Sequence, residues 1–195
     1  MAHLPTTSRP PKSGNAALTS AALIQAALGA EFVLAGLSKA VDPDYPVQFR
    51  GFVQGSPGAA SGALSGVIQW LVVPNLDALA ELSKVTELVA GAVLLVTALE
   101  VLRRRLSGPL GAQHAYEPLA ALISSAAALV LGGMSLAIYL IEGGRLPSIN
   151  PAYAFGSPIA VELLLVPLAL GIAWLELARF RALRGDSTPQ RAGVS

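Results

Sequence analysis

The sequence predicts an all-α integral membrane protein, a bundle of four transmembrane helices. Of the 195 residues, 53% are hydrophobic and only 13% are charged, whereas an average soluble domain has about 25% charged residues. Four apolar runs reach about 20 residues or more, the length at which a helix crosses roughly 30 Å of hydrocarbon. The runs are rich in alanine and leucine and lack the alternation of period two that is typical of strands.

Composition also excludes several kinds of site. The chain has no cysteine, which removes disulfides, iron–sulfur clusters and thiolate metal ligands. Its two histidines, His3 and His114, lie outside the apolar runs, so we expect no metal site and no haem held between helices. The net charge is +1 and no basic stripe is interleaved with aromatics, so no nucleic-acid partner is expected. We therefore expect no cofactor held covalently or by metal ligation, and a quinone or a lipid is the candidate for a non-covalent ligand.

The predicted helices occupy residues 16–40, 82–102, 118–141 and 158–178. They form one transmembrane domain, residues 16–180, between polar tails at 1–15 and 181–195 that we expect to be disordered. The first apolar run, at about 25 residues, is too long for the core of a signal peptide, so the helix is expected to be retained. An Asp-Pro-Asp turn ends it, three arginines end the second helix, and prolines begin the third and fourth.

A long loop, residues 41–81, joins the first two predicted helices. Its segment 63–73 is apolar but too short to span, and it ends with Trp70 near Pro74. We expect a short interfacial or re-entrant helix here, with Trp70 at the depth of the lipid headgroups. The alternative is a plain loop hairpin packed on the bundle.

The distribution of basic residues predicts the orientation. Nine of the thirteen lie in the two tails and in the loop after the second helix: Arg9, Lys12, Arg103, Arg104, Arg105, Arg179, Arg181, Arg184 and Arg191. The other side has four: Lys39, Arg50, Lys84 and Arg145. The positive-inside rule therefore puts both termini in the cytoplasm.

Three glutamates fall within the outer half of the predicted membrane region: Glu31, Glu87 and Glu162, with Lys39 and Lys84 near them at the outer ends of the helices. Charged groups at that depth are costly and often functional. They would form a polar site that is open to the outer leaflet, suited to a quinone carbonyl or to proton transfer. Alternatively each carboxylate pairs with a lysine or with backbone and pins helices together. Glu87 and Glu162, near helix starts, are also favoured there by the helix dipole.

Small and polar residues predict how the helices pack. Gly29, Gly36 and Gly91 let helices approach closely. Gln25 is expected to bond to a neighbouring helix. Glu100 and Glu176, close to arginines near the cytoplasmic ends, are expected to form interfacial ion pairs.

Two segments carry a resemblance to a known family. "QAALGAEFVLAGLSKAVDP" resembles the first helix of DoxX/DoxD-like membrane proteins, Arg-x3-Gly-x6-Gly-x2-Lys, with Gly29, Gly36 and Lys39 in register and Gln25 in place of the arginine. "ELVAGAVLLVTALEVLRRR" is similar to the second helix of the family, where Glu87, Gly91 and Arg103 match its Glu-x3-Gly opening and its closing basic residue.

The resemblance implies a redox setting in a bacterial inner membrane, because the family includes the small subunit of thiosulfate:quinone oxidoreductase. Within that setting we expect an accessory, structural subunit of a respiratory or photosynthetic complex, because the chain has no cysteine and no histidine in its apolar runs. Membrane lipids and other subunits would be its partners. The alternative is a quinone-binding subunit that uses the outer carboxylates, which would be catalytic only as part of an oxidoreductase with a partner. A small transporter is the second alternative, and the two halves of the chain show no convincing inverted repeat to favour it.

Overall fold

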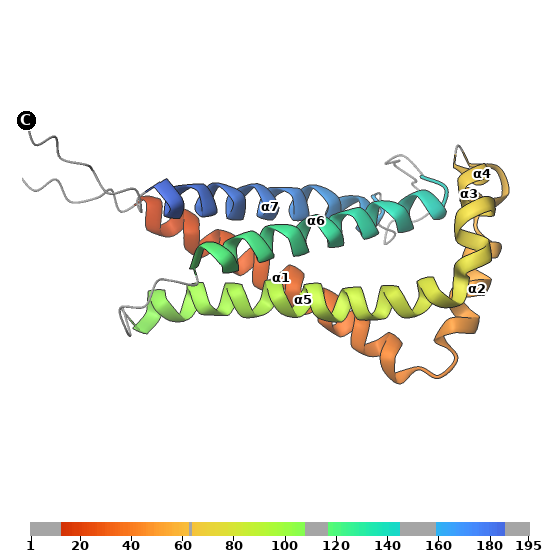
Figure 1. Ribbon diagram of the computed structural model, residues 1–195, viewed down its shortest axis with the longest axis horizontal. Helices are drawn as coiled ribbons and strands as arrows, with labels where there is room; N and C mark the ends of the chain where they lie inside the picture. The colour runs from red at the N-terminus through yellow and green to blue at the C-terminus, as the bar shows by residue number, and fades with distance from the viewer. Residues whose placement is uncertain (1–12, 63, 108–116, 145–158, 186–195) are drawn as a thin grey trace, which may run out of the picture.

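The computed structural model describes residues 13–62, 64–107, 117–144 and 159–185. Within these ranges the chain is helical and has no strand, so the predicted all-α membrane bundle is confirmed. Four long helices run alternately up and down: α1 (Ser13–Val41), α5 (Leu76–Ser107), α6 (Glu117–Ile141) and α7 (Val161–Gly185). Figure 1 shows α5, α6 and α7 along one axis, with α1 crossing them obliquely. Each contributes a segment that is long and apolar enough to span a membrane.

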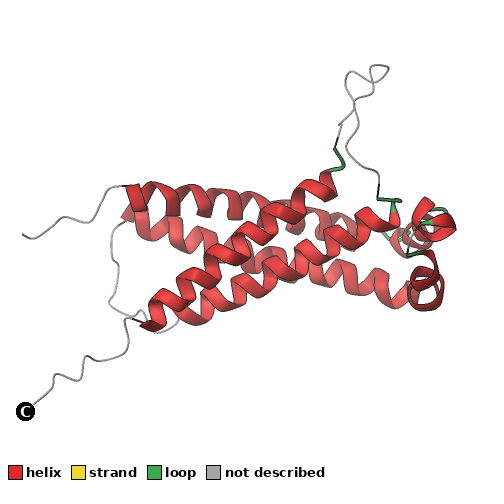
Figure 2. Ribbon diagram, turned by 90° about the horizontal axis from the view of Figure 1, so that it is seen from above, coloured by secondary structure: helices red, strands yellow, loops and turns green. Residues whose placement is uncertain are grey.

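Short helices cover one end of this bundle, which we call the capped end. They are α2 (Tyr45–Gln54), α3 (Pro57–Ser61), α4 (Ser65–Val67), the π-helix η1 (Ile68–Val72) and the 3₁₀ helix η2 (Val73–Asn75). They run across the bundle and not down between its helices (Figures 1 and 2). The segment expected to form a short helix within 63–73 is therefore helical from Ser65 and does not enter between the long helices, and Trp70 on it is 79% exposed.

The core is built from the paired helices α1 with α5 and α6 with α7, and α5 also packs on α6. Its fully buried members are mostly leucine and alanine, with Leu94 and Leu131 at 0% exposure. Many other large apolar side chains point outward, such as Leu34 at 61% and Trp174 at 68% exposure. An apolar outer surface of this extent is what lipid, and not water, would cover.

The long helices extend beyond the predicted runs, except that α7 begins at Val161 instead of residue 158. Helix α5 begins at Leu76 instead of residue 82 and ends at Ser107, and its 32 residues measure about 48 Å at 1.5 Å per residue. The helix is therefore longer than the hydrocarbon layer is thick. An apolar run marks only the part of a helix that lies within lipid, so the prediction missed the polar ends. Helix α7 continues to Gly185, so residues 181–185, which the sequence assigns to a disordered tail, are helical. At the other end α1 begins at Ser13, so residues 13–15 of the expected N-terminal tail are helical as well. Residues 1–12 and 186–195 lie outside the described residues.

Candidate ligand site at the capped end

Glycines bring the backbones of α1 and α5 into direct contact. A Cβ on Gly29 would lie 2.6 Å from the Leu95 nitrogen and 2.9 Å from the Gly91 oxygen. A Cβ on Gly91 would lie 2.9 Å from the Val33 nitrogen. Backbone atoms cannot move aside as flexible side chains do, so at both positions the packing requires glycine.

The same interface continues to an ion pair. A Cβ on Gly36 would lie 2.9 Å from Leu88 Cγ and 3.0 Å from Glu87 Cβ, so this third glycine lets α5 approach the end of α1. One turn later the Lys39 ammonium donates to Glu87 Oε1. The Glu87 side chain is 2% exposed, and its second oxygen, Oε2, has no hydrogen-bond partner among the described residues. Glu87 thus fixes α5 to α1 through the lysine.

Tyr45, at the start of α2, covers this ion pair. Its hydroxyl is 2.7 Å from Ser83 Oγ, and its ring centre lies 5.7 Å from Lys39 Nζ and 5.9 Å from Lys84 Nζ. Both ammonium groups are close enough for cation–π attraction to the ring. Burial raises the pKa of the Tyr45 hydroxyl above its ordinary value of 10.0, because desolvation disfavours the phenolate. Tyr45 is therefore a neutral phenol at physiological pH.

A cavity of about 720 Å³ opens beside this cluster, between α2 and the capped-end portions of α5, α6 and α7. Pockets of about 300–1,000 Å³ are typical of small-molecule sites. Its apolar walls come from Phe49, Phe52, Val72, Leu79, Leu82, Met134, Ala137, Ile138 and Ile141. Its polar groups come from Lys39, Tyr45, Gln48, Ser83, Thr86, Glu142 and Glu162.

The charges around the cavity select a kind of ligand. Lys39 is the cation in the wall, and Glu87 balances its charge. Glu142 and Glu162 add two carboxyl groups. The wall therefore offers hydrogen-bond donors and acceptors without net positive charge, which disfavours phosphate and carboxylate ligands. The mostly apolar walls and these hydrogen-bonding groups suit a molecule with carbonyl or hydroxyl groups on a large apolar body.

The predicted site residues lie in different surroundings. Lys39 and Glu162 line the cavity, while Glu87 is buried at the α1–α5 contact. Lys84 is outside the cavity lining and pairs with Glu81 at 2.8 Å. Glu31 is exposed on α1 and also outside the lining, so the three carboxylates do not share one site. The reason is helical phase: at 100° per residue, Glu31 is turned about 200° from Gly29, which faces α5.

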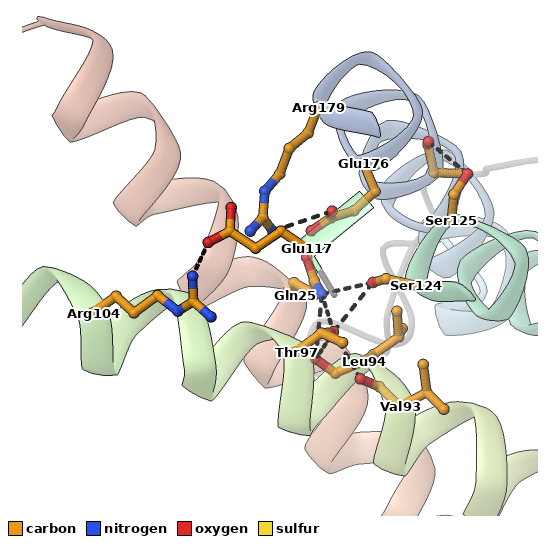
Figure 3. Close-up of polar contacts among 11 residues, drawn as sticks. Gln25, Val93, Leu94, Thr97, Arg104, Glu117, Ser124, Ser125, Glu176 and Arg179 are labelled. Carbon is orange, nitrogen blue, oxygen red and sulfur yellow. Dashed lines mark hydrogen bonds and ion pairs between the residues drawn. The ribbon is translucent and has the colours of Figure 1, made fainter. Parts of the chain in front are cut away.

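A second polar cluster lies toward the opposite end of the bundle, around Gln25 (Figure 3). The Gln25 amide nitrogen lies 2.8 Å from Thr97 Oγ1, 2.9 Å from Ser124 Oγ and 3.3 Å from the Leu94 carbonyl oxygen. These bonds join α1 to α5 and α6, which confirms the expectation that Gln25 bonds to neighbouring helices. The side chain is 4% exposed, so the cluster is a buried tie between helices.

Arginine pairs surround this second cluster. Arg103 and Arg104 both donate to Glu100, and Arg179 Nη1 lies 3.4 Å from Glu176 Oε2. The expected partners are thus correct, and Glu176 is in addition buried in the bundle, at 6% exposure. Arg179 lies nearly one turn further along α7 and points back toward Glu176 (Figure 3).

The sequence did not single out several residues of the site. Tyr45, Ser83 and Glu142 contribute polar groups, and Phe52 contributes an aromatic wall. Some signal was present, because Tyr45 follows the turn that ends α1 and Ser83 lies one turn before Glu87. Glu142 directly follows the apolar run that ends at the same end of the bundle. What the sequence lacked was the direction in which α2 folds back over α5.

Comparisons with known proteins give no match: no family model, no curated protein and no solved structure matches this chain.

Proposed function

We propose that this chain is a membrane subunit that holds a neutral lipophilic ligand of the quinone class in the capped-end cavity. The observation that carries the proposal is the cavity itself, about 720 Å³, in which mostly apolar walls surround hydroxyl, amide, ammonium and carboxyl groups. Phe49 and Phe52 provide flat apolar surface for a ring. Lys39 offers a donor to a carbonyl oxygen, and Glu162 offers an acceptor to a hydroxyl group.

In this proposal the chain is an accessory subunit of a larger redox complex. It has no cysteine, and its two histidines lie outside the apolar runs, so electrons would reach a bound quinone from a partner. The role of the chain is then to hold and orient the ligand: the ion pair of Lys39 with Glu87 fixes one wall of the cavity.

The setting is part of the same proposal: a DoxX-like protein of the bacterial inner membrane, with both termini cytoplasmic. Two observations support it. The contact between α1 and α5 contains the three glycines that carry the resemblance, Gly29, Gly36 and Gly91. The ion pair of Lys39 with Glu87 lies at the same contact. The basic residues are also concentrated on the side of the termini. A reporter fused to the C-terminus should be active in the cytoplasm, and activity only outside would contradict this orientation.

Ligand binding can be tested with a short-chain ubiquinone analogue and purified protein in mild detergent. We expect native mass spectrometry to detect one bound quinone per chain. Ala137→Phe, which places a ring into the cavity lining, should abolish binding. Ala126→Phe is the matched control, because Ala126 is an exposed alanine on the same face of α6, three turns away and outside the lining. Equal binding by both variants, or none by the unmodified protein, would overturn the proposal.

A further inference from the structure

Glu31 faces outward from the middle of a membrane-spanning helix. It lies ten residues before Val41 in the span Leu18–Val41, which is about 15 Å, or half the hydrocarbon thickness. Its side chain is exposed, and no hydrogen bond or ion pair joins it to another described residue. Ionisable residues at this depth almost always face a bundle interior and have a partner. Among the residues that the structure describes, Glu31 has neither.

The surface around Glu31 is shaped for another helix. Ala27 and Ala35 lie one turn before and one turn after Glu31 on the same side of α1, and small residues allow a second helix to approach closely. Ile24, at 47% exposure, and Leu34, at 61% exposure, provide apolar contacts beside them. We call this surface, made of Ile24, Ala27, Glu31, Leu34 and Ala35, the Glu31 face.

We propose that the Glu31 face is covered by a transmembrane helix of another protein, which presents an arginine or lysine to Glu31 at mid-membrane depth. Charge complementarity carries this assignment, since a carboxylate surrounded by hydrocarbon is stabilised by a cation with which it can form a hydrogen bond. The inference rests on the accessory-subunit role proposed above and adds the surface and the chemistry of the partner.

A second copy of this chain does not meet the requirement. In the part of the chain that the structure describes, the cations of the capped half are already paired with carboxylates of their own chain: Lys39 with Glu87, Lys84 with Glu81, and Arg50 with Asp77. A symmetric dimer through this face would moreover bring Glu31 toward Glu31, and like charges repel. These two points favour a different protein as the partner.

Site-specific photo-cross-linking in native membranes tests the proposal. A photoreactive amino acid at Leu34 probes the Glu31 face, and one at Val130, which is 51% exposed on α6, probes a different apolar surface. We expect the Leu34 probe to give one major protein adduct that the Val130 probe does not give. Mass spectrometry should locate the adduct on a helix with an arginine or lysine in its apolar run.

Variants of Glu31 make the test specific. Glu31→Leu removes a lipid-facing charge and should leave the fold intact, but it should lower the adduct yield about three- to twenty-fold, the range for one polar contact between membrane helices. Glu31→Arg should lower it further, and replacing the basic residue of the partner by glutamate should restore it. An adduct between two copies of this chain, adducts with lipid alone, or a yield unchanged in Glu31→Leu would overturn the proposal.

The ligand proposal and the partner proposal can each be refuted without affecting the other. Quinone binding by the purified subunit is measured without the partner, and the cross-link is measured without added quinone. Loss of the adduct in Glu31→Leu with quinone binding retained supports the Glu31 face. A purified subunit that binds no quinone, but still gives the Glu31-dependent adduct, refutes the ligand proposal and leaves the interface standing.

Discussion

Replacing Lys39 by methionine tests the ion pair on which one wall of the cavity depends. The change keeps the length of the apolar stem and removes the charge. Glu87 would then remain 2% exposed, with neither oxygen bonded to a cation, because its Oε2 already has no partner among the described residues. Breaking a buried pair by removing one partner costs about 3–5 kcal/mol. We expect a loss of that size in the free energy of unfolding.

The double variant Lys39→Met with Glu87→Leu separates the pair from its parts. It removes both charges and fills the space with apolar atoms, so its stability should return to within about 1–2 kcal/mol of the unmodified protein or exceed it. Lys84→Met is the control: its partner Glu81 has a side chain that is 59% exposed, so the carboxylate left behind stays solvated and the loss should be only about 0–1 kcal/mol.

Stability can be measured by reversible unfolding in mixed micelles, with the denaturing detergent fraction increased stepwise and helicity followed by circular dichroism. The reasoning is refuted if Lys39→Met costs no more than the Lys84→Met control. It is also refuted if the double variant is as unstable as Lys39→Met, because the cost would then come from lost packing of the lysine stem and not from a stranded charge.

Three further predictions concern single positions. Gly91→Ala should destabilise the protein by about 1–3 kcal/mol, because the added Cβ meets the backbone of α1. Gly133→Ala, with no atom within 4 Å of the added carbon, should be neutral or should stabilise the protein. Equal unfolding midpoints for the two variants would contradict this prediction. Gln25→Leu should lower the free energy of unfolding by about 0.6–1.7 kcal/mol, because its hydrogen bonds to α5 and α6 are lost. The same unfolding titration measures this change, and a stabilised variant would argue against the buried tie. Because the pKa of Tyr45 is raised, its stabilising contribution is complete below pH 10 and declines as pH rises through the folded-state pKa; ultraviolet absorbance should show a phenolate component that titrates late and is missing in Tyr45→Phe.

The fold could be predicted because lipid allows few alternatives. In hydrocarbon the backbone must satisfy its own hydrogen bonds, so apolar runs of this length form helices. The extensions beyond lipid were not predictable from hydropathy, because Leu76 to Glu81 and Arg179 to Gly185 contain charged residues and still continue α5 and α7. Helix caps and side-chain pairs determine where these two helices end, and the length of an apolar run gives no information about either.

The candidate site was predictable in part. Depth along each helix, read from the sequence, brought Lys39 and Glu162 to the same end of the bundle, and both line the cavity. The rotation of each helix about its own axis could not be predicted. Glu31 lies within three turns of Lys39 but faces outward, whereas Gln25 faces the interior. Which side of a helix is buried depends on its neighbours, and an evenly apolar helix such as α1 carries little periodic signal of its own.

Photoaffinity labelling with an azido-quinone tests the central claim, that the capped-end cavity holds a neutral lipophilic ligand. After irradiation of the protein in membranes, we expect the label to be concentrated on cavity-wall residues of two elements, Phe49 and Phe52 of α2 and Met134 of α6. Excess unlabelled quinone should prevent this labelling, and Ala137→Phe should abolish it. Label spread evenly over lipid-facing positions such as Leu170 and Trp174, and insensitive to competitor, would contradict the claim.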